Sequence, residues 1–235
     1  MLGVTDMPRQ FPVREEISGL VGPEGPGIVG ACSIGGTQFH NNSTKMPRSP
    51  ERRLTIRDVS VNRCEHFACI ARGVAFEDVK VTDIRGGGRA LSFLWGCLYS
   101  RVALRGHIGG ILVRWRVDPR DEEFSRTFLQ ANLSAYQHVD WALDISEAQF
   151  SYFLDFLGIP SGLVRRNPDR HFVMTRGAAN TLLASDTEPD VWRISAELLI
   201  ESGLEDTVIA CGGAGKRLQR DLDAAKELRD QGLLQ

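Results

Sequence analysis

Hydrophobic positions recur at a fixed spacing in the first half of the chain. The octet LTIRDVSV, which begins at Leu54, is followed twenty residues later by VAFEDVKV from Val74, and a third version, CLYSRVAL, begins at Cys97. Within each octet the apolar residues are spaced two, three and two residues apart, which is the alternation of a strand with one buried face. The three-residue step places two polar residues outward together. Each octet therefore predicts a strand, a bend and a second strand.

The three octets align in four columns, and every column is apolar in all three copies. The columns are Leu54/Val74/Cys97, Ile56/Phe76/Tyr99, Val59/Val79/Val102 and Val61/Val81/Leu104. One repeat cannot bury its inward face alone, so we expect parallel coils over residues 54–73, 74–96 and 97–116, stacked on shared internal ladders. A further column is expected from Ile70, Phe93 and Val113. A meander of antiparallel strands with chance similarity is the alternative.

These repeats resemble the coils of right-handed parallel β-helix proteins and, more loosely, those of pentapeptide-repeat proteins. The resemblance covers residues 54–116, and the five-residue signature fits only once in full, at QANLS from Gln130 to Ser134. The resemblance implies a mainly β fold, with a short parallel β-helix or solenoid of about three coils.

The segments that flank the repeats have a different character. Residues 1–53 are rich in glycine and proline and predict an irregular N-terminal cap. Residues 117–176 predict an extension of strand, helix and hairpin, in which HVDWALDI is a strand and NPD at 167–169 is a turn. The sequence SEAQ is a capping box that favours a helix over 146–158, with a further strand as the open alternative. Residues 177–235 predict a C-terminal helical segment, with one helix opened by Pro189 and another from about Lys216.

Composition narrows the class of protein. The net charge of −2 over 235 residues excludes the global basicity of a nucleic-acid coat and leaves no strong nucleic-acid signal. The start has no secretory pattern, and no window is long and apolar enough to predict a membrane span. Five cysteines in such a chain are expected to be reduced, so we expect a cytoplasmic protein.

Three groups of residues could carry chemistry. Cys64, His66 and Cys69 are metal-type ligands, but no second pair has standard spacing, and we predict no metal site. The loop CGGAGKR departs from a phosphate-binding P-loop at Ala210 and Arg217, which leaves open whether Gly212–Lys216 binds an anion. His138, Asp140 and Asp144 could form an acid–base pair, but their spacing is also that of the polar positions of a half-buried strand. No cofactor is expected.

The outward corners of the repeats supply the candidate binding residues. These are Asp58, Asp78, Arg101, Arg57, Glu77 and Arg105. The sequence shows no set of reactive side chains that would converge on a substrate. It therefore favours a non-catalytic binding or assembly protein that presents this surface to a protein or other macromolecule. A carbohydrate-active enzyme with a site on the outer face is the alternative. Open ends of a stack often pair, so a homodimer is also possible.

Overall fold

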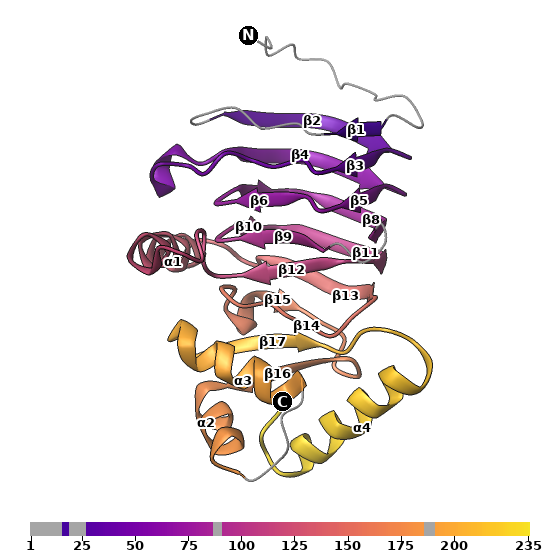
Figure 1. Ribbon diagram of the computed structural model, residues 1–235, viewed down its shortest axis with the longest axis vertical. Coiled ribbons are helices and arrows are strands. Elements are labelled where there is room, and N and C mark those ends of the chain that lie inside the picture. The colour runs from indigo at the N-terminus through magenta and orange to yellow at the C-terminus, as the bar shows by residue number, and fades with distance from the viewer. Residues whose placement is uncertain (1–15, 19–26, 87–90, 186–190) are drawn as a thin grey trace.

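The protein is mixed α/β, with strands making up most of its regular structure. The computed structural model describes residues 16–18, 27–86, 91–185 and 191–235. The strands lie in successive layers along the long axis of the molecule, helix α1 lies beside the layers, and the other three α-helices gather at the C-terminal end (Figure 1).

The main sheet is parallel and contains eleven strands. Its principal path has seven strands, in the order β1-β3-β5-β8-β11-β13-β15, and curves as a half-barrel. Strands β2, β4, β7 and β10 are paired beside this path. The strands are β1 (Glu16–Ser18), β2 (Ile28–Gly35), β3 (Gln38–His40), β4 (Thr55–Asn62), β5 (Glu65–Phe67), β7 (Ala75–Glu77), β8 (Lys80–Gly86), β10 (Leu98–Ser100), β11 (Val102–Ile108), β13 (Leu143–Phe150) and β15 (Val164–Arg165).

The parallel register of the repeats is confirmed at two of the predicted columns. Ile56 of β4 pairs with Phe76 of β7, which pairs with Tyr99 of β10. Val61 of β4 pairs with Val81 of β8, which pairs with Leu104 of β11. The antiparallel meander is therefore wrong. The further column is displaced by one residue, because Phe93 pairs with Leu112 rather than with Val113.

The bend inside each octet is a residue in the left-handed backbone region. Asp58, Asp78 and Arg101 have φ of 54°, 53° and 54°, and Ala31 of β2 has φ of 53°. Aspartate tolerates this conformation better than most side chains, because its short polar group bonds locally to the backbone. These corners turn their side chains outward, which explains the three-residue step in the hydrophobic pattern.

Two smaller sheets complete the strand layers. One is parallel, with the order β12-β9-β6, from β6 (Ile70–Arg72), β9 (Ser92–Trp95) and β12 (Ile111–Arg114). The other is antiparallel, with the order β14-β17-β16, from β14 (Leu154–Asp155), β16 (His171–Thr175) and β17 (Asp206–Ala210). A single bridge between Val113 and Phe156 joins the two.

The described residues form four α-helices, which cover parts of these sheets. They are α1 (Glu122–Tyr136), α2 (Arg176–Ala184), α3 (Val191–Ser202) and α4 (Gly215–Asp230), with short 3-10 turns at Pro50–Arg52 and Ser161–Leu163. Helix α1 docks through Asn132, whose amide donates to the carbonyls of Gly96 and Cys97 at 3.2 Å each. Helices α2, α3 and α4 enclose a second hydrophobic core with β16 and β17, centred on Trp192, Leu199 and Ile209.

The predicted fold class is wrong. The sequence favoured a short parallel β-helix or solenoid of about three coils, with an irregular N-terminal cap and a C-terminal helical appendage, whereas the chain is mixed α/β on a large half-barrel sheet. Parallel pairing begins at residue 16 and extends to residue 165, far outside the repeats at 54–116. The physical reason is that backbone hydrogen bonds pair strands whether or not their side chains repeat.

The flanking segments also differ from expectation. The region 28–40, which was predicted to be irregular, contains β2 and β3. Residues 146–158 form the end of β13 and then β14, so the helix predicted there is wrong and the alternative of a further strand is correct. The predicted hairpin is wrong, since β15 pairs with β13 and β16 with β17. The last segment is not purely helical, because β17 lies at the centre of its own sheet. Helices α3 and α4 are as predicted, although Pro189 lies outside the described residues.

Candidate functional site

The six predicted surface residues lie along one outward-facing region, which we call the outer strip. It consists of Arg57, Asp58, Glu77, Asp78, Arg101 and Arg105, together with Asp144 and Glu147, which the structure adds. Parallel register brings these residues together from β4, β7, β11 and β13 and from the corners between strands. The outer strip therefore crosses several successive layers of the sheet.

Ion pairs link the upper part of the outer strip from one layer to the next. Arg57 contacts the Glu77 carboxylate at 2.5 Å, and the two residues are directly opposite in the register. Arg101 binds Asp78 in a bidentate manner, with N–O distances of 2.6 and 2.7 Å. The hydrogen bonds from the Arg101 side chain lower the pKa of Asp78. The Asp78 carboxylate is therefore ionised and fixed in position at neutral pH.

The lower part of the outer strip centres on Arg105. Its guanidinium contacts the Asp144 carboxylate at 2.5 Å and the Glu147 carboxylate at 3.5 Å. Burial raises the pKa of the Asp144 carboxyl, but hydrogen bonds from Arg105 and from Ser146 outweigh that effect and lower the pKa to about 2. A carboxyl with so low a pKa holds no proton at neutral pH, so Asp144 is suited to a fixed negative charge and not to general-acid chemistry.

The outer strip carries more negative than positive charge. It has five carboxylates and three guanidiniums, and Asp58 has no ion pair within the described part of the chain. Asp58 and Arg101 are exposed, and the Glu147 side chain is 73% exposed. The arrangement can attract and orient a partner that carries positive charge, because rigid surface charges steer encounter and fix register.

The cysteine and histidine cluster is not assembled as a metal site. His66 is buried, with Nε2 donating to the Gly109 carbonyl at 2.5 Å and Nδ1 within 2.6 Å of the Ser92 hydroxyl. A carbonyl can only accept, so Nδ1 is left as the acceptor of the Ser92 proton. Cys64 is fully buried in the core. No group of three or more metal-type side chains converges within the residues that the structure describes.

The glycine-rich loop before α4 serves close packing. A side chain at Gly212 would lie 2.0 Å from the Tyr152 carbonyl oxygen, and the Gly213 amide donates to the Phe150 carbonyl at 2.8 Å. The loop therefore ties the start of α4 to the end of β13. Whether the segment Gly212–Lys216 also binds an anion stays a prediction.

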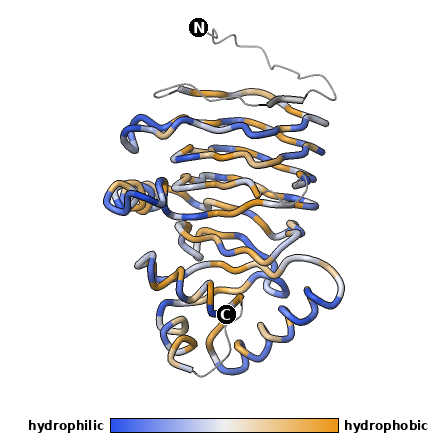
Figure 2. Tube along the Cα trace, in the orientation of Figure 1, coloured by the Kyte–Doolittle hydropathy of each residue, from blue (hydrophilic) through white to orange (hydrophobic). Residues whose placement is uncertain are grey.

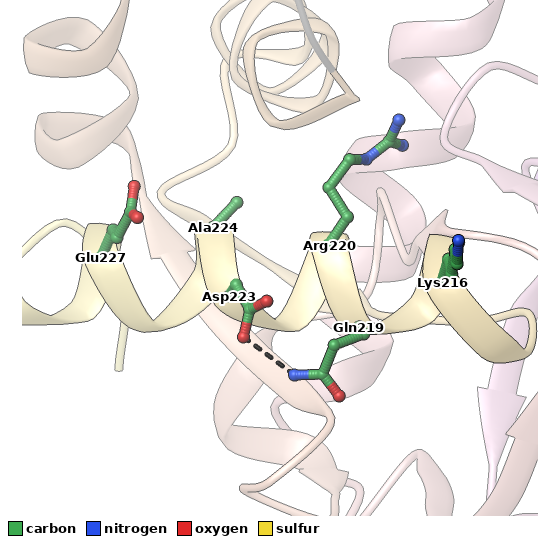
Figure 3. Close-up of a pocket in the computed structure, with 6 residues that line it drawn as sticks. All are labelled: Lys216, Gln219, Arg220, Asp223, Ala224 and Glu227. Carbon is green, nitrogen blue, oxygen red and sulfur yellow. Dashed lines mark hydrogen bonds between the residues drawn. The ribbon is translucent and has the colours of Figure 1, made fainter.

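A surface hollow of about 420 Å³ lies along α4. All of its lining residues come from this one helix: Lys216, Gln219, Arg220, Asp223, Ala224 and Glu227. Figure 3 shows that these side chains point in different directions, with Gln219 turned to Asp223, to which it donates at 2.8 Å. A catalytic site needs groups that converge on one reacting atom, and this hollow does not provide them.

Sequence reasoning found most of the outer strip and missed its lower part. Asp144 was considered only with His138 and Asp140, and the structure pairs it instead with Arg105. Glu147 was read as part of a helix cap, although it lies on β13 opposite Arg105. The available clue was the alternation of polar and apolar residues from Asp144 to Phe150, which is typical of a strand.

No protein-family model, curated protein or solved structure matches this chain. Within the part of the chain that the structure describes, no helix is both long enough and apolar enough to span a bilayer.

The buried histidines predict how stability depends on pH. Burial lowers the pKa of His171 to about 4, with further lowering by Arg166 and Arg170, and burial also lowers the pKa of His66. Both histidines are neutral in the folded protein and bind protons more readily when unfolded, near pH 6.5. The contribution of the two neutral histidines to the free energy of unfolding is therefore fully present above about pH 6.5 and is lost as the pH falls. We expect a loss of about 2 kcal/mol from His171 alone between pH 7.5 and pH 5, measured by urea denaturation.

Two variants test whether His171 causes this loss of stability at low pH. His171→Gln should weaken the pH dependence over this interval, because glutamine does not titrate. The exposed His138→Gln should retain it. An equally steep loss of stability in His171→Gln and in the unaltered protein would contradict the assignment.

Proposed function

We propose that the protein is a non-catalytic binding or assembly protein whose outer strip docks a protein partner with a basic surface. The observation that carries the proposal is the row of ionised side chains, fixed by ion pairs across several layers of one sheet. A sheet of this kind is rigid before the partner binds. Binding therefore costs little conformational entropy on the side of this protein.

The state of the titratable groups supports binding over catalysis. Asp144 is held ionised by Arg105, and His66 and His171 are buried among internal partners. Catalytic groups need pKa values close to the working pH and access to a substrate. Asp144 instead holds a fixed charge that is buried in its ion pair with Arg105, and the two histidines form hydrogen bonds in the interior.

The excess of carboxylates indicates the chemistry of the partner. Asp58 has no ion pair among the described residues, Glu147 shares Arg105 with Asp144, and both Asp58 and Glu147 are exposed. A partner with lysine or arginine side chains would compensate these charges, whereas a polyanion such as nucleic acid would be repelled. Since the charges lie at the surface, binding should weaken as salt screens them.

A comparative capture experiment tests the proposal. The triple variant Asp58→Ala, Asp78→Ala and Arg101→Ala is expected to fold, because surface ion pairs contribute little stability and because Ala31 already adopts the same left-handed corner conformation. Its capture of basic proteins should fall by about tenfold or more, which corresponds to about 1.4 kcal/mol. Quantitative mass spectrometry of the captured proteins, at about 50 mM and about 500 mM salt, measures the effect.

A matched triple variant provides the control. Asp169→Ala, Arg176→Ala and Glu205→Ala removes the same charges from the C-terminal part of the chain and should leave capture unchanged. Equal capture by the outer-strip variant and the control would refute the proposal. Turnover of a glycan in a substrate panel, abolished by the outer-strip variant, would favour a carbohydrate-active enzyme.

A further inference from the structure

The N-terminal end of the main sheet exposes an unusually apolar strand. Strand β2 pairs with β4 on one side, and among the described residues nothing pairs with its other side. Ile28 is 65% exposed and Val29 is 46% exposed. They are two of the four large hydrophobic side chains that are exposed in the described part of the chain, and they are adjacent.

The exposed Val29 side chain continues an internal ladder of the sheet, whereas the adjacent Ile28 pairs in register with Thr55. Val29 pairs in register with Ile56, which pairs with Phe76, and Phe76 pairs with the buried Tyr99. Each lower member of this ladder is covered by the strand above, whereas Val29 is the last member. Figure 1 places β2 at the outermost layer, and Figure 2 shows that this layer is largely hydrophobic. The hydrophobic ladder therefore ends at an open edge.

Apart from the corner at Ala31, the edge lacks the usual protection against pairing. Exposed edge strands of natural proteins carry lysine, proline or inward charges, or are very short. Strand β2 has eight residues, IVGACSIG, and none of them is charged or proline. Such a strand offers a row of free backbone donors and acceptors to another strand.

The chain's own N-terminal segment is poorly suited to cover this edge. Every window of eight residues within positions 1–15 contains Pro8, and Pro12 follows four residues later. Proline has no amide hydrogen, so it interrupts a ladder of hydrogen bonds. The linking segment at 19–26 likewise contains Pro23 and Pro26.

We propose that β2 pairs with β2 of a second copy of this chain, about a two-fold axis, to form a homodimer. An uncharged strand is complementary to itself, because no like charges meet when two copies pair antiparallel. Pairing along the whole strand satisfies the free backbone groups and places Ile28 and Val29 of each copy opposite Gly35 and Ile34 of the other. Strand β2 lies next to Arg57 of the outer strip, but the pairing uses none of the strip's side chains, so dimerisation and partner binding can be tested with different variants.

Measuring the mass of the full chain in solution tests the proposal. We expect a concentration-dependent equilibrium between monomer and dimer in sedimentation velocity and light scattering. The variant Ile28→Lys, Val29→Lys places charges on the edge and should raise the dimer dissociation constant by about tenfold or more. Ile28→Lys alone, at the more exposed position, is the variant to use if the double variant does not fold, as judged by circular dichroism.

The control variant changes an equally exposed residue elsewhere. Ile194 on α3 is 53% exposed, and Ile194→Lys should leave the dimer intact. A wild-type chain that stays monomeric at high concentration would overturn the proposal, as would dimerisation that only Ile194→Lys abolishes. Deletion of residues 1–15 adds a further check. A monomer that dimerises only after this deletion would show that the chain's own segment covers the edge, and would also overturn the proposal.

Discussion

Replacing Asp155 with alanine should lower the free energy of unfolding by about 3–4 kcal/mol. Asp155 lies on β14 with its side chain only 6% exposed, and it forms an ion pair with Arg114 of β12. Its second oxygen accepts a hydrogen bond from the buried Ser195 hydroxyl of α3 at 3.0 Å. One carboxylate thus joins the parallel strand layers to the C-terminal sheet and to a helix. Alanine would leave the Ser195 hydroxyl without its acceptor and Arg114 without its carboxylate, with the Val113 carbonyl still accepting from Arg114. Urea denaturation at pH 7.5 measures the loss.

Two further variants separate the effect of burying the Asp155 ion pair from the effect of removing a carboxylate. Glu205→Ala removes a carboxylate from the exposed ion pair with Arg176 and should cost less than about 1 kcal/mol. The double variant Arg114→Met, Asp155→Leu removes both charges and should recover much of the stability, because apolar side chains replace a buried ion pair without leaving a charge unpaired. A loss in Asp155→Ala no larger than that in Glu205→Ala would contradict the expectation.

The parallel register of the repeats could be predicted because side chains report it directly. A strand with one buried face must place apolar residues at every second position, and a corner residue that points outward shifts the pattern by one. Ile56, Phe76 and Tyr99 therefore identified strands that pair in register. The extent of the sheet could not be read in this way. Strands β13 and β15 pair through backbone groups with no copy of the octet.

Helix α1 was missed because its start resembles the end of a repeat. The sequence DPRDEE breaks the apolar columns, and it also supplies a helix cap: the Asp121 carboxylate accepts from the Phe124 amide at 2.9 Å. Glu122 and Glu123 lie in the first turn, where acidic residues favour the helix. The same residues thus end one pattern and begin another. Only the apolar spacing that follows, with Phe128 and Leu129 buried, distinguishes the two interpretations.

The candidate site could be predicted as far as the repeat extends. Alignment of the octets placed Arg57 opposite Glu77 and Asp78 beside Arg101, and both ion pairs are present. The partners of Arg105 lie 39 and 42 positions later, on β13, which belongs to no repeat. Pairing at such separation depends on how the sheet continues, and neither spacing nor composition contains that information.

A second large loss of stability is expected from Gly212→Ala, about 3 kcal/mol or more. A side chain at this position would lie 2.0 Å from the Tyr152 carbonyl oxygen, 2.5 Å from its carbon and 2.8 Å from the Phe150 carbonyl oxygen. All three atoms are backbone, so no rotation of a flexible side chain can relieve the clash. The segment after β17 would have to move away from the end of β13. Urea denaturation measures the change.

Gly162→Ala is the matched control. Its added carbon meets no atom within 4 Å, so this substitution should be neutral or stabilise slightly, by up to about 1 kcal/mol. The comparison also bears on the glycine-rich loop before α4. If Gly212→Ala is strongly destabilising, the glycine is needed because the loop packs against the Tyr152 backbone. The similarity of CGGAGKR to a phosphate-binding loop is then explained by packing. Equal stability of Gly212→Ala and Gly162→Ala would mean that the loop stands away from β13 in solution, with its amide groups free to bind an anion.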